Sequence, residues 1–313
     1  MSIIEVKNLS YKYANKLIID KVNFSAKSSE ITAILGPSGS GKSTFIKLLA
    51  GFISSQKGKI LLDNKLINNL EPQYREISYV SQTPSLFPFL NIYENINLAI
   101  KGKNNNEKKL LVKKLLAKFN MADKISLYPH NLSVGEQQRV SIIRAMASEA
   151  KVMLFDEPYA NIDSINKDNL ISESLNLLKN SNLIKIMITH NIEEALLFAD
   201  KIYVLYEGKI LQAGTASDLY HQPKNQFVAR SFGLINKLHE NNKKYFIRAT
   251  DFKISKKEIK GSFKVNIIDK KFYFGRFLYH VQRVDLQTLR IISDMDLKTS
   301  DIIYVTILNK LKI

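Results

Sequence analysis

The sequence contains no cysteine, few histidines and no long apolar run. Without cysteine there can be no disulfide and no thiolate metal site, which fits a reducing compartment. The five histidines form no H-x-x-x-H pair, so we expect no structural metal. No apolar run approaches the roughly 18 to 20 residues needed to span a bilayer. The start, MSIIEVKNLS, lacks the basic and apolar regions of a signal peptide, so we expect the chain to stay in the cytoplasm.

Charge is unevenly distributed along the 313 residues. The formal net charge is +17, and residues 221–313 carry 19 Lys and Arg against 8 Asp and Glu. An anionic partner, either nucleic acid or lipid headgroups, would explain this excess. A solvated surface in a chain that is rich in lysine, asparagine and isoleucine throughout is the explanation we favour.

Short β-branched runs alternate with helical patterns through residue 231. This alternation predicts an α/β domain over residues 1–231, with helices packed on a sheet. The predicted strands are Ile3–Lys7, Ile31–Leu35, Lys59–Leu62, Ile77–Val80, Val152–Phe155, Ile184–Ile188 and Lys201–Tyr206. The predicted helices are Lys42–Ala50, Glu107–Phe119, Val134–Ser148, Ser164–Lys179 and Ile192–Ala199. Residues 91–148 show helical patterns only and predict a helical subdomain of about residues 84–150, with KGKNNNEKK at 101–109 as a flexible link.

The helical pattern stops after the segment ARSFG, which ends at Gly233. The polar stretch HENNKK, residues 239–244, is typical of a linker. Short strand-like runs separated by turn residues follow it and predict a small all-β domain, a barrel or a sandwich, over residues 232–313.

The segment ILGPSGSGKST contains the pattern G-x-x-x-x-G-K-[ST], directly after one predicted strand and directly before a predicted helix. The glycines let successive backbone N–H groups point at a phosphate, and the start of the helix adds its positive end. Lys42 can reach the β- and γ-phosphates of a nucleotide, and the Ser43 hydroxyl can ligate Mg²⁺. The candidate cofactor-binding residues of this loop are Gly36, Ser38, Gly39, Gly41, Lys42, Ser43 and Thr44.

Two acidic residues end the apolar strand in KVMLFDEP. Asp156 is placed to hold Mg²⁺ through water, and Glu157 to polarise an attacking water. By itself such a pair marks only the end of a strand, but together with the glycine loop it indicates nucleotide hydrolysis.

Two polar residues follow other strands in the same way. Gln82 comes after ISYV, and His190 comes after IKIMIT. A parallel sheet would bring both to the edge that carries the phosphate loop. There Gln82 could contact the metal and the water, and His190 could bond the γ-phosphate. Taken singly, each is an ordinary surface residue.

Tyr13, in the segment YKYANKL, is the candidate aromatic ring to stack on an adenine. A tyrosine on an edge strand is the structural alternative, and Tyr11 is a neighbouring rival.

The segment LSVGEQQR contains the pattern [ST]-x-x-[DE] before an amphipathic run, so Ser133 and Glu136 predict a capping box that opens a helix. A capping box does not require Gly135 or the two glutamines that follow. A serine hydroxyl, a free N–H and a helix dipole are what the open side of a γ-phosphate needs.

These motifs together resemble the nucleotide-binding subunits of ABC transporters. LSVGEQQR is similar to the family signature LSGGQ, SQTPSLFP to its Q-loop, MLFDEP to its Walker B strand, YANID to its D-loop and MITHN to its H-loop. Their order and spacing match over residues 1–231. The resemblance implies a P-loop NTPase fold and the cofactors ATP and Mg²⁺.

The resemblance also implies a homodimer or a pair of ATPase subunits. In that family two subunits pack head to tail, and the signature of one closes over ATP held by the other. Ser133 and Gly135 would therefore complete a site in a partner chain, and Asp163 of the D-loop would lie at the same interface.

The signature departs from the family pattern at two positions. Val134 replaces a glycine, and it can be accommodated if its side chain points away from ATP. Glu136 replaces the glutamine and would bring negative charge near phosphate unless it caps the helix. Asn161 also stands where the family usually has alanine.

The segment after the ATPase motifs indicates which branch of the family the chain resembles. The segment GTASDLYHQPKNQFVARSFGLINKL is similar to the connection that leads, in binding-protein-dependent importers, to a regulatory β-domain of the TOBE type. This resemblance implies an importer of ferric iron, polyamines, sulfate or sugars, and YPHNLSVGEQQR favours the ferric-iron group. Implied partners are integral membrane permease subunits and, indirectly, a solute-binding protein, with the chain peripheral on the inner face of the membrane.

Gln82 and the segment TPSLFPFLNIYENI would receive the permease. Phe87, Phe89 and Ile92 have an alternative role, packing inside the helical subdomain, and exposure of these side chains would favour docking.

A soluble ABC ATPase that acts on nucleic acid or ribosomes through the basic C-terminal domain is the second hypothesis. Translation-linked members carry two cassettes, and repair members carry a long coiled-coil insertion. This chain has one cassette and no heptad insertion, so we do not expect nucleic acid as the partner.

Overall fold

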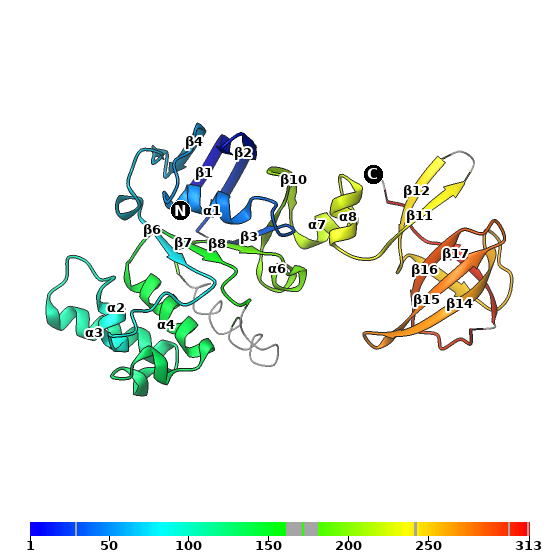
Figure 1. The fold of residues 1–313 in the computed structure, drawn as a ribbon. Helices are drawn as coiled ribbons and strands as arrows, with labels where there is room; N and C mark the ends of the chain where they lie inside the picture. The colour runs from blue at the N-terminus through cyan, green and yellow to red at the C-terminus, as the bar shows by residue number, and fades with distance from the viewer. Residues whose placement is uncertain (29, 161–170, 172–180, 241–242, 300, 312) are drawn as a thin grey trace. The chain divides into compact units, whose positions relative to one another are not determined.

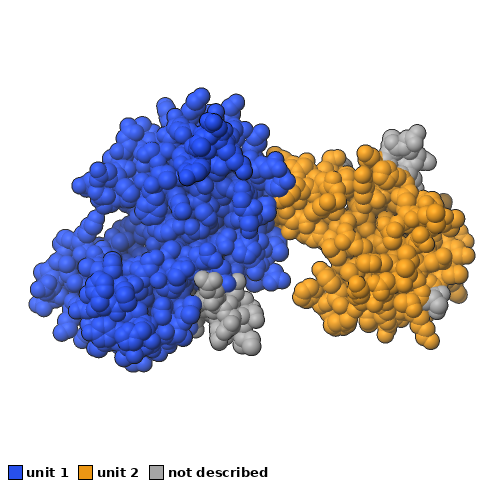
Figure 2. Space-filling model, viewed as in Figure 1, with its two compact units in different colours: residues 1–215 blue, residues 216–313 orange. Residues whose placement is uncertain are grey.

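The computed structural model describes residues 1–28, 30–160, 171, 181–240, 243–299, 301–311 and 313. The chain forms two compact units, residues 1–215 and 216–313 (Figure 2). Each unit has its own sheets.

An antiparallel sheet opens the first unit. Its strand order is β2-β1-β4-β5. The bounds are β1 Ile3–Tyr13, β2 Lys16–Lys27, β4 Lys57–Leu62 and β5 Lys65–Leu66. Burial alternates along β1 and β2, as expected for strands with one face on the core and one in solvent.

A six-stranded sheet with the order β10-β9-β3-β8-β7-β6 forms the centre of the same unit (Figure 1). The bounds are β3 Ile31–Leu35, β6 Ile77–Val80, β7 Val152–Asp156, β8 Ile184–Thr189, β9 Lys201–Tyr206 and β10 Lys209–Gly214. All pairs except β9 with β10 are parallel. Strands β3 and β8 are buried at every residue, as expected for parallel strands covered on both faces.

Helix α1 (Lys42–Ala50) joins the two sheets into one core. Its buried residues Phe45, Ile46, Leu48 and Leu49 belong to a cluster that also includes residues of β1, β2, β4, β7 and β8. The rings of Phe24 and Phe45 meet edge to face, with centroids 5.3 Å apart. This packing fixes the start of α1, and with it the loop that precedes the helix.

Three helices gather near β6, the edge strand of the six-stranded sheet (Figure 1). They are α2 (Ile92–Asn97), α3 (Asn105–Lys118) and α4 (Val134–Ala147), with short 3-10 turns between them. Each helix begins with a capping box, in which the side chains of the N-cap residue and of N3 bond each other's backbone N–H. The N-cap residues are Asn91, Asn104 and Ser133.

In the first unit, α6 (Ile192–Phe198) lies between β8 and β9 along the chain. Helices α7 (Ala216–His221) and α8 (Gln226–Ser231) open the second unit. In the part of the chain that the structure describes, no helix is long and apolar enough to cross a bilayer.

The rest of the second unit consists of antiparallel strands. A hairpin of β11 (Ile235–Glu240) and β12 (Lys243–Arg248) accompanies a sheet with the order β13-β17-β14-β15-β16. The remaining bounds are β13 Phe252–Ser255, β14 Phe263–Tyr273, β15 Arg276–Arg283, β16 Thr288–Ser293 and β17 Ile302–Ile307. Leu238 and Ile247 of the hairpin pack with Val265, Val281 and Ile303 in one core. The predicted all-β character of this region is confirmed.

Two of the predicted connections are wrong. HENNKK is not a linker, because His239 and Glu240 end β11 and Lys243 and Lys244 begin β12, in direct register. KGKNNNEKK is a link only as far as its fourth residue, because Asn104 caps α3 and the helix begins at Asn105. The boundary between the compact units falls before Ala216, ahead of the predicted boundary at residue 232, and the domain limits 1–231 and 232–313 stay a prediction.

Candidate nucleotide-binding site

The loop between β3 and α1 encloses the Lys42 ammonium. Lys42 is 5% exposed, and its Nζ donates to the carbonyl oxygens of Gly36 at 2.8 Å and Pro37 at 3.0 Å. Burial lowers the pKa of Lys42, and the carboxylates of Glu157 and Asp156 oppose that shift. The chain therefore holds a nearly buried cation in place by wrapping backbone carbonyls around it.

Two glycines of the loop are required by the backbone. Gly41 has φ of +104°, a left-handed conformation that glycine adopts without strain, and it ends the loop as the N-cap of α1. A Cβ at Gly36 would lie 2.2 Å from the carbonyl oxygen of Leu205 in β9. The loop can therefore pass this close to the sheet only without a side chain.

We expect Gly36→Ala to lower the free energy of unfolding by about 1–3 kcal/mol, because the backbone of a central strand cannot move aside for the new methyl group. Urea denaturation followed by circular dichroism measures the change. Gly39→Ala is the matched control, since a Cβ there meets no atom within 4 Å and only the strain of φ +77° remains. Equal stability of the two variants would contradict the proposed clash.

The first predicted acidic residue, Asp156, ends β7, and the second, Glu157, begins the turn after it. Asp156 Oδ2 accepts a hydrogen bond from the hydroxyl of Tyr79 in β6. Burial and this carboxylate raise the pKa of Tyr79, so the phenol stays neutral and donates. Sequence reasoning missed Tyr79, which fixes one carboxylate oxygen of Asp156 and leaves the other for a ligand.

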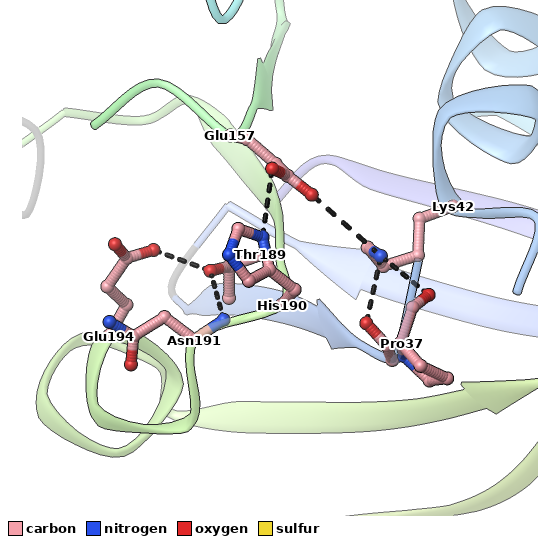
Figure 3. A network of polar contacts seen from close by, with 8 residues as sticks. Pro37, Lys42, Glu157, Thr189, His190, Asn191 and Glu194 are labelled. Atoms are coloured by element: carbon pink, nitrogen blue, oxygen red, sulfur yellow. Dashed lines mark hydrogen bonds and ion pairs between the residues drawn. The ribbon is translucent and has the colours of Figure 1, made fainter. Parts of the chain in front are cut away.

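Glu157 lies between Lys42 and His190 (Figure 3). Its Oε1 is 3.8 Å from Lys42 Nζ, and its Oε2 is 2.9 Å from His190 Nδ1. Because a carboxylate only accepts, the neutral His190 ring must carry its hydrogen on Nδ1, which leaves Nε2 as its second polar atom. Glu157 also has a left-handed backbone conformation, with φ of +46°.

The turn after β8 orients His190. Thr189 Oγ1 donates to Glu194 Oε2 at 2.5 Å and accepts the Asn191 N–H at 3.0 Å (Figure 3). Thr189 and Glu194 are buried, so this pair fixes the backbone on both sides of His190. Neither residue was predicted, and their only sequence signal is the T-H-N-x-x-E spacing.

A cavity of about 460 Å³ opens over the loop. Its lining combines two ammonium groups, three hydroxyl groups, the glycines at the start of α1 and Glu157. The lining residues are Lys16, Ile18, Ser38, Gly39, Gly41, Lys42, Ser43, Thr44 and Glu157. Cations, hydroxyls and helix N–H groups are the donors that a polyphosphate needs, so the residues present fit ATP. The Ser43 hydroxyl, the free oxygen of Asp156 and the Gln82 amide are oxygen donors of the kind that Mg²⁺ takes together with water.

The other predicted residues have separate positions. Tyr13 is 72% exposed at the end of β1, whereas Tyr11 packs against the core, so Tyr13 is the ring available for stacking. Gln82 is exposed just after β6, at the same sheet edge as Glu157 and His190. Asp163 and the predicted helix Ser164–Lys179, apart from Ile171, lie outside the described residues.

The signature segment begins α4. Ser133 is exposed and caps the helix, and its Oγ accepts the N–H of Glu136 at 3.3 Å. Val134 is 49% exposed, so its side chain does not pack into its own subunit. Gln137 Nε2 donates to the carbonyl oxygens of Pro129 and Leu132, which holds the segment before the cap. Ser133 is therefore accessible at the surface of its own chain, and Gly135 is half-buried beside it.

Comparison with known proteins identifies the class. Residues 19–160 match the family model described as ABC transporter. The chain is 38% identical over 237 residues to the spermidine/putrescine import ATP-binding protein PotA of Clostridioides difficile, covering 75% of this chain and 68% of that protein. The protein of the same name from Borreliella afzelii is 38% identical over 238 residues, covering 75% and 69%.

Solved structures agree with this class. The dimeric, ADP- and Pi-bound ATP-binding cassette MJ0796 aligns with a TM-score of 0.60 at 27% identity, covering 68% of this chain and 98% of that one. CbiO1 from Clostridium perfringens, part of the ABC transporter complex cbiONQ, aligns with a TM-score of 0.63 at 28% identity, covering 68% and 88%.

The chain therefore belongs to the ABC transporter family, as an ATP-binding subunit with the P-loop NTPase fold. It is an ATP-hydrolysing transport ATPase whose cofactors are ATP and Mg²⁺. The resemblance inferred from the motifs is confirmed at this level.

Proposed function

We propose that this chain is the ATPase subunit of an ABC importer for polyamines, which couples ATP hydrolysis to permease subunits in the membrane. The observation that carries the chemistry is the contact of Glu157 with both Lys42 and His190 at the carboxyl ends of three parallel strands, where Lys42 and Glu157 line one cavity. The solute rests on the relatives, which are named for spermidine and putrescine import and not for ferric iron. Polyamines thus replace ferric iron as the favoured solute.

Each residue of the site has one task in this proposal. Lys42 and the N–H groups at the start of α1 would bind the phosphates, and Ser43, Asp156 and Gln82 would hold Mg²⁺. Bound Mg²⁺·ATP supplies the phosphoanhydride bond that is cleaved. Glu157 would orient the attacking water and accept its proton, and His190 fixes the Glu157 carboxylate by donating its Nδ1–H. Only the doubly protonated ring could also donate from Nε2 to the γ-phosphate. Tyr13 stacks on the adenine.

The proposed working unit is a head-to-tail homodimer. Ser133 is exposed and Gly135 is half-buried at the start of α4, where they offer a hydroxyl, a backbone N–H and a helix dipole. Such donors complete the open side of a γ-phosphate bound by a second subunit. MJ0796, which shares this fold, is dimeric with ADP and Pi bound.

The permease contact is proposed at the segment after β6. Phe87 is 44% and Phe89 is 72% exposed, whereas Ile92 is fully buried in the helical group. The exposure of Phe87 and Phe89 therefore favours a role in docking the permease, whereas Ile92 packs inside the helical subdomain. This contact would hold the chain on the inner face of the membrane, where a solute-binding protein acts on the other side of the permease.

Purification of the tagged full-length chain from native membranes in mild detergent tests this function. We expect a polytopic permease in stoichiometric amount, identified by mass spectrometry. Phe89→Ser should lose the permease, because a serine removes most of the apolar contact area, whereas Leu66→Ser, at a 52% exposed position in β5, should keep it.

Ribosomal proteins or nucleic acid without a membrane partner would instead support the soluble ATPase hypothesis, which the comparisons do not favour. Uptake of labelled spermidine then tests the solute. We expect Glu157→Gln to abolish that uptake in cells that depend on this chain and to leave ferric iron uptake unchanged.

A further inference from the structure

An ion pair neutralises the acidic residue of the signature segment. Glu136 Oε1 pairs with the ammonium of Lys124, which ends a 3-10 turn (Ala122–Lys124) ahead of α4. Glu136 Oε2 accepts the backbone N–H of Ser133 at 2.9 Å. Both carboxylate oxygens are thus engaged by the same subunit.

The pair is half-buried. The Lys124 side chain is 26% and the Glu136 side chain 22% exposed, so water screens their attraction less than that of a typical surface pair. The hydrogen bond from Lys124 is the main cause that lowers the pKa of Glu136. Two further charges act on the pKa of Lys124 in opposite directions: Asp123 raises it and Arg139 lowers it.

The arrangement bears directly on the proposed partner site. Without Lys124, the Glu136 carboxylate would lie one residue after Gly135 at a surface that must approach a triphosphate, and like charges in a partly dehydrated interface repel. The bond from the Ser133 N–H also keeps Glu136 turned back into its own helix cap. The Ser133 hydroxyl accepts the Glu136 N–H, so its own hydrogen is not used by this bond and can be donated to a phosphate oxygen.

We propose that Lys124 is a positioning residue for ATP-dependent dimerisation, which makes an acidic signature segment compatible with a partner subunit's ATP. Lys124 acts through Glu136 and does not contact nucleotide. The inference rests on the proposed head-to-tail dimer, and it explains how this chain tolerates glutamate where the family signature has glutamine.

The test measures ATP-dependent dimer formation by sedimentation velocity, in full-length chains that carry Glu157→Gln to stop turnover. We expect Lys124→Ala to raise the ATP concentration for half-dimerisation about three- to tenfold, the range of coupling between contacting groups. Adding Glu136→Gln to Lys124→Ala should restore the parent value within about twofold, because no charge then needs neutralising.

Lys103→Ala is the matched control. Lys103 pairs with Glu149 at 2.9 Å, beyond the opposite end of α4, so its loss removes a similar ion pair far from Ser133. Its half-dimerisation concentration should equal that of the parent. Thermal unfolding of each variant by circular dichroism separates a local effect from a loss of fold.

The outcomes are distinct. Unchanged dimerisation of Lys124→Ala, or failure of Glu136→Gln to rescue it in a folded chain, overturns the role of Lys124 while the dimer stands. If the Glu157→Gln parent forms no dimer at any ATP concentration, the proposed assembly is wrong and the inference falls with it.

Discussion

Replacing Glu157 with glutamine should reduce steady-state phosphate release about 10²- to 10⁴-fold, the usual contribution of a general base. Glutamine keeps an oxygen that can accept the His190 Nδ1–H, so the geometry of the site survives while the proton acceptor is lost. ATP should bind at least as tightly as before, because the carboxylate that stands 3.8 Å from Lys42 no longer repels the triphosphate. The prediction is therefore a protein that binds ATP, does not hydrolyse it and accumulates as a dimer.

Phosphate release and the binding of a fluorescent ATP analogue separate the two effects. Glu149→Gln serves as the control, since Glu149 is exposed, pairs with Lys103 and lies away from the cavity. Its turnover should match that of the unmodified chain. Hydrolysis by Glu157→Gln at the unmodified rate would remove Glu157 from the proposed role.

The strands of the six-stranded sheet were the most predictable part of the fold. Ile31–Leu35, Ile77–Val80 and Lys201–Tyr206 were predicted to the residue, as was α1. Three of these four elements are short, mainly apolar runs bounded by polar or glycine residues. β3 and the centre of β9 are buried, as that pattern predicts, whereas β6 at the edge of the sheet is mostly half-buried.

Strand β2 was missed because its burial alternates and its polar residues face solvent. Its place is set by pairing with β1 in the antiparallel sheet, with irregular register. The start of α3 was missed because a run of asparagines is typical of a turn, although one of them is the N-cap. Local composition predicted these segments poorly because long-range pairing and a single cap decided them.

The sequence motifs indicated candidate residues for the site, but they did not indicate which atoms those residues contact. Motif spacing predicted Lys42, Glu157 and His190, and the structure joins them through Glu157. Carbonyl oxygens hold Lys42, and every residue has a carbonyl, so no sequence pattern marks those partners. The left-handed backbone of Glu157 and the buried pair of Thr189 and Glu194 depend in the same way on neighbouring strands.

Replacing Lys42 with alanine should weaken ATP binding by about 1.5–3 kcal/mol, the contribution of charge-assisted hydrogen bonds, which corresponds to a roughly 10- to 150-fold higher dissociation constant. The fold should lose little stability. Burial lowers the pKa of Lys42, so the folded chain spends free energy to keep this ammonium charged and nearly out of water. Removing it relieves that cost, while water in the adjoining cavity can bond the freed carbonyls of Gly36 and Pro37.

Calorimetric titration with ATP and thermal unfolding measure the two quantities on the same samples. Lys47→Ala is the control, because Lys47 belongs to the same helix but is exposed, and it should change neither quantity appreciably. A Lys42→Ala protein that binds ATP with unchanged affinity would contradict the phosphate-loop assignment. A variant that binds weakly because it is unfolded would show instead that the buried ammonium stabilises the loop. Weak ATP binding together with an unchanged melting temperature would show that Lys42 serves nucleotide binding and not the stability of the fold.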